Sequence, residues 1–92
     1  MTETTLRKLE IVNVKGLHAR ASAKLVEVVE GFDATAEVGK DGMSASGDSI
    51  MGLLMLAASK GTTIEVQTSG PDAEALADAI DALVADKFGE DM

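Results

Sequence analysis

The sequence predicts an α+β fold, an open-faced β-sandwich in which three helices cover one face of a four-stranded antiparallel sheet, in the order βαββαβα. Along the chain, segments with alternating or β-branched apolar residues are interspersed with segments whose apolar residues recur at helical spacing. The pair Asp41-Gly42 separates two of the short strand segments, and these residues accept the positive φ that a hairpin turn requires. Because the chain has 92 residues and no linker or internal repeat, we expect residues 1–92 to form a single domain.

Four segments have strand character. They are residues 4–14, 33–38, 43–46 and 62–68. The most regular is 62–68, in which Ile64 and Val66 alternate with polar residues. Gly16 follows the first segment and ends it, and the second and third segments flank the Asp41-Gly42 turn.

Three segments have helical spacing. They are residues 19–30, residues 50–58 and a segment that follows Pro71 and runs to Lys87. Gly31 ends the first helix, and Asp48 or Ser49 caps the second. Pro71 suits the first turn of the third helix, because that turn tolerates a residue without a backbone N–H.

The composition narrows the classes of function. A net charge of −8 argues against nucleic acid and against an anionic membrane surface, because both are bound through lysine and arginine. The first residues lack the basic and apolar parts of a signal peptide, and the longest apolar run, 50–58, is too short to span a bilayer. With one histidine and no cysteine, we expect neither a metal site nor a cofactor. The sequence therefore predicts a cytoplasmic protein.

The candidate reactive residue is His18, the single histidine of the chain. It lies directly before the predicted helix 19–30, where unpaired backbone N–H groups and the helix dipole favour an anion. The N–H groups of Ala19 and Arg20 and the guanidinium of Arg20 could then hold a phosphoryl group that forms on the imidazole. This arrangement predicts phosphoryl transfer. The alternative is an ordinary surface or capping histidine.

The predicted helix 50–58 is apolar on nearly all sides, which exceeds what one core face can bury. Leu53, Leu56 and Ala57 share one side and are the core candidates. Ile50, Met51 and Leu54 would form an exposed surface of the kind that binds partners. In the alternative interpretation, all of these side chains are buried.

Two motifs far apart in the chain resemble those of a known family. Gly16-Leu17-His18-Ala19-Arg20, together with the segment 49–54 and Lys60-Gly61, resembles HPr, the phosphocarrier of the bacterial phosphotransferase system. The segments 31–34 and 53–56 and the pair Gly70-Pro71 are more similar to its nitrogen-related branch, NPr. The resemblance covers nearly the whole chain.

The resemblance implies specific roles. Enzyme I would phosphorylate His18 on Nδ1 with phosphate from phosphoenolpyruvate, and an EIIA-type protein would accept the group. Arg20 would steady the phosphoryl group, while Leu17 would join the partner-binding surface. Ser49 would be a regulatory site for an HPr kinase/phosphorylase, although its role as a helix cap explains it equally well. The carrier would be a monomer and not an enzyme. The resemblance leaves open which EIIA it serves, and whether the output is sugar transport or nitrogen regulation.

One position departs from the family pattern. Ala21 stands where the family has proline, so the start of the helix is less rigid but keeps a backbone N–H. Two other classes compete with the carrier. An acyl carrier protein would use Asp48-Ser49-Ile50, but such proteins are helical bundles and would leave His18 unused. A regulatory HPr-like module would bind partners without carrying phosphate.

Overall fold

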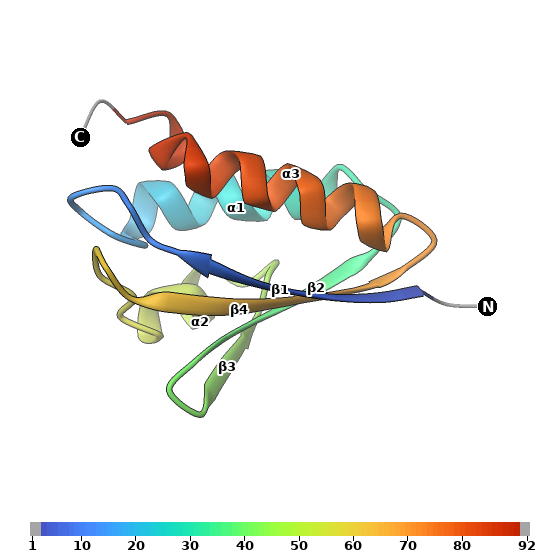
Figure 1. Ribbon diagram of the computed structural model, residues 1–92, viewed down its shortest axis with the longest axis horizontal. Helices are drawn as coiled ribbons and strands as arrows, with labels where there is room; N and C mark the ends of the chain where they lie inside the picture. The colour runs from blue at the N-terminus through green and yellow to red at the C-terminus, as the bar shows by residue number, and fades with distance from the viewer. Residues whose placement is uncertain (1–2, 91–92) are drawn as a thin grey trace.

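A computed structural model describes residues 3–90 of the chain (Figure 1). The elements in chain order are β1 Glu3–Glu10, α1 Ala19–Glu30, β2 Thr35–Lys40, β3 Met43–Ser46, α2 Ile50–Met55, β4 Thr63–Gly70, α3 Ala73–Ala85 and the 3-10 turn η1 Lys87–Gly89. The strands form one sheet in the order β1-β4-β2-β3, and every neighbouring pair is antiparallel. The predicted fold class is confirmed.

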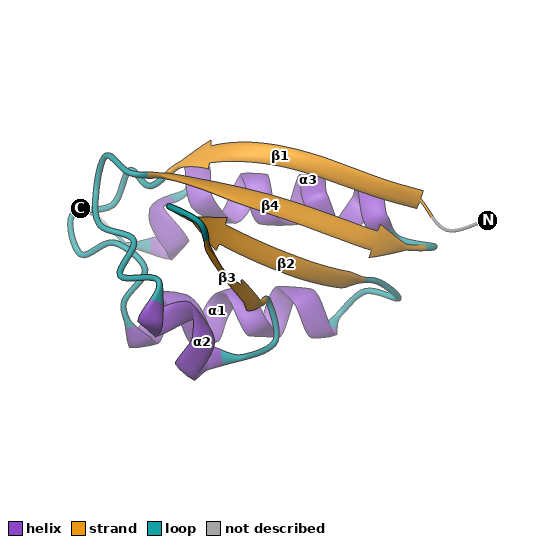
Figure 2. Cartoon of the chain, turned by 90° about the horizontal axis from the view of Figure 1, so that it is seen from below, coloured by secondary structure: helices purple, strands orange, loops and turns teal. Residues whose placement is uncertain are grey.

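Alternation along β4 explains why the sheet has one covered and one open face. Ile64 and Val66 point to the covered side and are fully buried, while Glu65 and Gln67 between them are exposed. Helices α1 and α3 lie side by side against the covered face (Figure 2). Helix α2 lies at the β3 edge and packs against α1. The core fills the space between the two long helices and the sheet.

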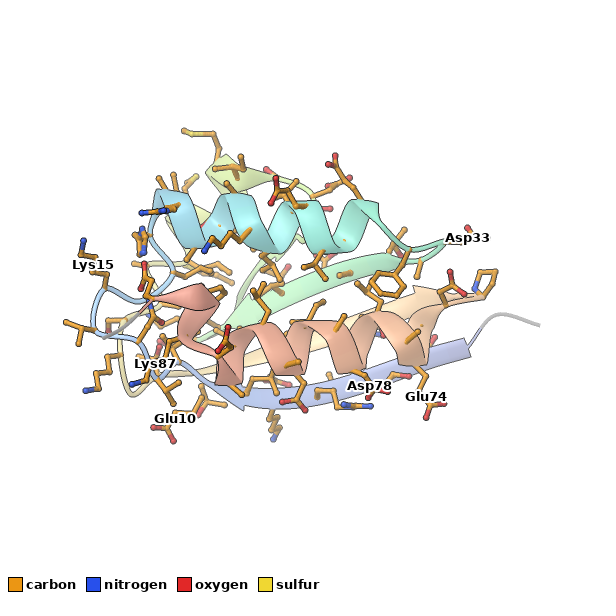
Figure 3. The ribbon with its side chains drawn as sticks, turned by 90° about the horizontal axis from the view of Figure 1, so that it is seen from above. Glu10, Lys15, Asp33, Glu74, Asp78 and Lys87 are labelled. Atoms are coloured by element: carbon orange, nitrogen blue, oxygen red, sulfur yellow. The ribbon has the colours of Figure 1, made fainter. Side chains whose placement is uncertain are left out.

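Charged side chains tie α3 to the strand at the edge of the sheet. The Arg7 guanidinium on β1 donates a hydrogen bond to the Asp78 carboxylate at 2.8 Å and approaches Asp81 at 3.5 Å. Both carboxylates keep much of their surface in water. Figure 3 shows Asp78 and Glu74 along the side of α3 next to β1. Because these ion pairs are exposed, they orient the helix more than they stabilise the fold.

Several predicted boundaries are confirmed and several are wrong. Helix α1 and strand β3 have their predicted bounds. Strand β2 both begins and ends two residues later than predicted, and β4 begins one residue later and ends two residues later. Strand β1 ends at Glu10 rather than at residue 14. Ile11 still exchanges backbone hydrogen bonds with Thr62 and Gly61, but beyond it the chain bends into the loop before α1.

The second helix is shorter than predicted, and this changes one core residue. Helix α2 ends at Met55, and Ala57 follows with a φ of 52°. The predicted core position of Ala57 is therefore wrong: its side chain is exposed, and Ala58 is buried instead. The Lys40 ammonium donates hydrogen bonds to the carbonyls of Leu56 and Ala57, which satisfies the groups that a helix end leaves unpaired.

None of the helices in the described part of the chain is long and apolar enough to cross a membrane.

Candidate functional site

Gly16 allows the loop before α1 to pass close to another segment of backbone. It is buried with a φ of 66°, and a Cβ there would lie 2.4 Å from the carbonyl oxygen of Ala58. The neighbouring Leu17 N–H donates to that same oxygen at 2.8 Å. Only glycine meets both requirements, a positive φ and no side chain. The contact fixes where the next residue, His18, enters the helix.

His18 is the N-cap of α1. Its backbone is extended, and its Nδ1 accepts a hydrogen bond from the Arg20 N–H at 3.3 Å. The first N–H to reach a carbonyl within the helix is that of Ser22, which donates to the His18 oxygen at 2.8 Å. The N–H groups of Ala19, Arg20 and Ala21 therefore have no carbonyl partner inside the helix. These donors and the helix dipole lie at the end of α1 that His18 begins, and the Arg20 N–H already donates to Nδ1.

Arg20 lies on the exposed side of the first turn. Its guanidinium makes no hydrogen bond or ion pair within residues 3–90. Ala21, by contrast, is fully buried against the core. The side chain at this position therefore contributes to the core. The backbone N–H of Ala21 is one of the three that have no carbonyl partner inside α1.

The second nitrogen of His18 has a partner from the far end of the chain. Nε2 contacts the carboxylate of Glu90, 72 residues away in sequence. The other oxygen of Glu90 accepts a hydrogen bond from Asn13 Nδ2 at 2.8 Å, and the same amide donates to the Gly16 carbonyl at 2.8 Å. Asn13 is fully buried, and its Oδ1 has no partner within the described residues.

The surroundings of Glu90 favour its ionised form. The hydrogen bond from Asn13 lowers the pKa of the carboxyl below its ordinary value, against the opposing effect of burial. The hydrogen bond and charge of His18 and the charge of Lys15 act in the same direction. Glu90 therefore presents a carboxylate to the imidazole.

The backbone that delivers Glu90 is strained. Lys87 and Phe88 both have left-handed conformations, with φ of 57° and 56°. Such conformations cost about 1–2 kcal/mol for each residue with a side chain. The side chain of Phe88 is 1 % exposed, so its burial in the core offsets this cost. The Lys24 ammonium also holds the segment by donating to the Phe88 carbonyl at 2.6 Å.

A shallow hollow of about 260 Å³ lies beside His18. Lys15, Leu17 and Leu54 line it, together with residues 57–59. Figure 3 shows Lys15 at the tip of the loop before α1, at the same end of the molecule as Lys87. Lys15 is thus a positive side chain that lines the same hollow as His18.

The predicted partner surface is exposed in part. Met51 is 70 % and Ile50 40 % exposed, whereas Leu54 is only half-buried and lines the hollow. Met55, which the sequence analysis did not assign, is 68 % exposed beside them. The core positions of Leu53 and Leu56 are confirmed. Leu17, expected at the partner surface, is 4 % exposed and packs in the core, where it supports the loop that carries His18.

Ser49 caps α2, which resolves the choice between Asp48 and Ser49. Its Oγ accepts a hydrogen bond from the Gly52 N–H at 3.1 Å. The Asp48 carboxylate instead accepts from the hydroxyl of Ser46 at 2.5 Å. No group of three or more potential ligands able to hold a metal ion occurs within residues 3–90.

Sequence reasoning did not find Asn13 and Glu90. Asn13 lies near the end of the predicted strand 4–14, and Glu90 lies beyond the last predicted helix. Neither has a local pattern that distinguishes it from an ordinary polar residue. Their roles depend on where η1 directs the chain, which is a property of the tertiary structure.

Comparisons with known proteins agree on one family. A sequence model described as "PTS HPr component phosphorylation site" matches residues 6–86. The phosphocarrier protein HPr of Cupriavidus necator is 44 % identical over 84 residues, which cover 91 % of this chain and 94 % of that protein. The phosphocarrier protein NPr of Escherichia coli is 42 % identical over 89 residues, 96 % of this chain and 99 % of that protein. Both branches of the family therefore match at nearly equal identity.

Solved structures agree with the sequence matches. A crystal structure of HPr from Thermoanaerobacter tengcongensis superimposes with a TM-score of 0.90 and 34 % identity, over 96 % of this chain and 99 % of that one. An HPr dimer from the same organism superimposes with a TM-score of 0.75 and 36 % identity, over 89 % of this chain and 94 % of that one.

Proposed function

Because the chain belongs to the HPr family of phosphocarrier proteins of the phosphotransferase system, we propose that His18 is the residue that carries its phosphoryl group. The protein is a carrier rather than a catalytic enzyme. The observation that supports His18 most directly is the position of Nδ1 at the start of α1, where it accepts from the Arg20 N–H and where the first N–H groups have no carbonyl partner inside the helix. Residues 1–92 act as one domain in this role.

The transfer step follows from this geometry. The lone pair of Nδ1 attacks the phosphorus of a phosphorylated donor, and the bond from phosphorus to the donor's leaving atom breaks with its electron pair. The Arg20 N–H, which caps the helix through Nδ1, is then free to donate to a phosphoryl oxygen. The Ala19 N–H and the Arg20 guanidinium supply further donors at the same place. Passing the group onward is the reverse step with an acceptor protein.

We assign the partners by family membership. Enzyme I, loaded from phosphoenolpyruvate, is the donor, and an EIIA-type protein is the acceptor. The carrier works in the cytoplasm as a monomer, although one of its solved relatives is described as a dimer. Lys15, which lines the hollow beside His18, and the exposed Arg20 suit a negatively charged phosphoryl group as it arrives.

Incubation with enzyme I and phosphoenolpyruvate tests the proposal. Intact mass should rise by one phosphoryl group, and the adduct should be lost in acid and stable in base. The His18→Ala variant should gain none, and Arg20→Lys serves as a variant with the acceptor intact. Phosphorylation of His18→Ala to the level of the natural protein would contradict the assignment.

The apolar side chains beside the hollow support a docking surface for both partners. Ile50, Met51 and Leu54 were predicted for it, and the exposed Met55 extends it. Methionine adapts its shape to different partners, which suits a carrier that binds a donor and an acceptor in turn. The Met51→Glu variant should weaken both interactions without unfolding the protein. An NMR titration with enzyme I that shifts only resonances of α3 would contradict this surface.

Ser49 supports a second, regulatory proposal. A phosphate on its hydroxyl, added by an HPr kinase/phosphorylase, would lie at the start of α2, where the helix dipole favours negative charge. It would place a dianion beside Ile50 and Met51 and so weaken docking of partners. The existing hydrogen bond from Gly52 shows that the Ser49 hydroxyl already has a structural role.

A further inference from the structure

The carrier proposal uses one nitrogen of His18 and leaves the other unexplained. Nδ1 accepts from the Arg20 N–H at the start of α1, whereas Nε2 contacts the Glu90 carboxylate. His18 is only partly exposed, and the side chain of Glu90 is 19 % exposed, so the contact lies largely out of solvent. A carboxylate that accepts from one ring nitrogen determines which of the two nitrogens carries the proton.

Three separate elements hold Glu90 in place. Asn13, from the loop before α1, donates to one of its oxygens and is itself fixed to the Gly16 carbonyl. Phe88 is buried in the core two residues earlier, and Lys24 on α1 holds its carbonyl. The chain turns before Glu90 through Lys87 and Phe88, which both have left-handed backbone conformations. Strain of this kind persists where the surrounding structure fixes it, and it is typical of functional sites.

We propose that Glu90 is a positioning residue for phosphoryl transfer, which accepts the Nε2–H of His18 and thereby keeps Nδ1 unprotonated and directed at the phosphate site. This inference rests on the proposed role of His18. When the Nδ1 lone pair forms its bond to phosphorus, the ring gains positive charge while the proton stays on Nε2. The Glu90 carboxylate stabilises that charge, as a carboxylate does behind the histidine of a catalytic triad.

The arrangement also limits repulsion between Glu90 and the phosphoryl group. The carboxylate contacts Nε2, and the phosphoryl group would form on Nδ1, so the imidazole ring lies between the two negative groups. Lys15 acts on Glu90 from the loop before α1, and Arg20 lies on the phosphate side of the ring. Glu90 therefore acts on the ring and leaves the anion site to the N–H groups.

Two variants of Glu90 test this role. Glu90→Ala removes the contact, and Glu90→Gln keeps its size but removes the charge. With phospho-enzyme I as the donor, kcat for phosphorylation should fall about tenfold in Glu90→Ala and less in Glu90→Gln, while KM stays unchanged. Glu37→Gln is the matched control. Glu37 lies exposed on β2, so this substitution removes the same charge from a residue that does not contact His18. Its kcat should equal that of the natural protein.

NMR of the imidazole supplies a readout that does not depend on transfer. In the natural protein, the Nε2–H proton of His18 should be shifted far downfield and should exchange slowly with water, because it donates to a carboxylate. That signal should disappear in Glu90→Ala and remain in Glu37→Gln. If Glu90→Ala is too unstable to assay, both kcat and the NMR signal of the Nε2–H proton can be measured in Glu90→Gln, because this variant preserves the shape of the side chain.

The outcomes separate the two proposals. An unchanged kcat in folded Glu90→Gln and Glu90→Ala would overturn the positioning role, as would a loss confined to KM. An Nε2–H signal that is the same in all variants would overturn the contact itself. If instead the natural protein takes no phosphate on His18 but shows the downfield proton, the contact stands and the proposed function fails.

Discussion

The chain starts two helices with a side-chain cap, at His18 and at Ser49, and the two starts differ in what lies behind the cap. His18 Nδ1 accepts from Arg20 N–H at 3.3 Å, and Ser49 Oγ accepts from Gly52 N–H at 3.1 Å. Behind His18, however, a second nitrogen contacts Glu90 from the other end of the chain. Ser49 caps a helix of six residues, and its neighbour Asp48 bonds to nearby Ser46.

The difference shows how a common structural device acquires chemistry. A cap needs only a side-chain acceptor and two or three following residues, so both caps are local properties of the sequence. A reactive cap also needs a fixed tautomer, a site for the anion and an approach for a partner. At His18 these come from Asn13, Glu90 and the hollow lined by Lys15 and Leu54, which belong to separate parts of the chain.

The largest effect should come from breaking the loop that leads to His18. We expect Gly16→Ala to lower the free energy of unfolding by about 3 kcal/mol, because it combines a left-handed conformation with a collision against the Ala58 carbonyl. Urea denaturation measures the loss. Gly61→Ala is the matched control: its φ is 89°, but a Cβ there meets no atom within 4 Å, so it should cost only about 1 kcal/mol. Equal losses in the two variants would contradict the importance of the close approach.

This contrast also shows what could be predicted from the sequence. Helix α1, strand β3 and the Asp41-Gly42 turn follow from short patterns, and the structure has them where the sequence places them. For the cap of α2 the sequence left Asp48 and Ser49 open, and the structure selects Ser49. The end of α2 could not be predicted, because it depends on Lys40 reaching the carbonyls of Leu56 and Ala57 from β2. The role of Glu90 could not be predicted for the same reason: it depends on tertiary structure, because η1 directs the chain so that Glu90 reaches His18.

The next prediction compares the phosphate side of the His18 cap with the fold. Arg20→Ala should slow phosphorylation by phospho-enzyme I about tenfold, because the guanidinium is exposed and available to the phosphoryl group. The free energy of unfolding, measured by thermal denaturation, should change by no more than about 0.5 kcal/mol. Lys8→Ala, which removes an exposed positive charge from β1, is the control for net charge and should leave the rate unchanged. If both variants slow transfer equally, Arg20 acts only through the overall charge.

A smaller effect should distinguish the Ser49 cap from the His18 cap. Ser49→Ala should destabilise the protein by about 1 kcal/mol through loss of the bond to Gly52 N–H, without changing the rate at which His18 is phosphorylated. Ser49→Asp keeps an acceptor at the cap but adds negative charge beside Ile50 and Met51, so it should slow phosphorylation by enzyme I. Equal rates and equal binding in the natural protein and in Ser49→Asp would leave Ser49 as a helix cap alone.

The smallest effect should appear at acid pH, behind His18. The hydrogen bond from Asn13, together with His18 and Lys15, lowers the pKa of Glu90 in the folded protein below its ordinary value of 4.5. The carboxylate therefore stabilises the fold at pH above 4.5, and this contribution is lost as the pH falls through the lowered value.

The midpoint of thermal unfolding, measured from about pH 7 to about pH 3, tests this dependence. The natural protein should be more stable than Glu90→Gln at neutral pH, and the difference should shrink only below the ordinary range of a glutamate, because the protonated carboxyl resembles the amide. Glu37→Gln supplies the background from the other carboxylates and should show no such convergence. A difference between the natural protein and Glu90→Gln that stays constant to the acid limit would mean that the charge of Glu90 does not stabilise the segment behind His18.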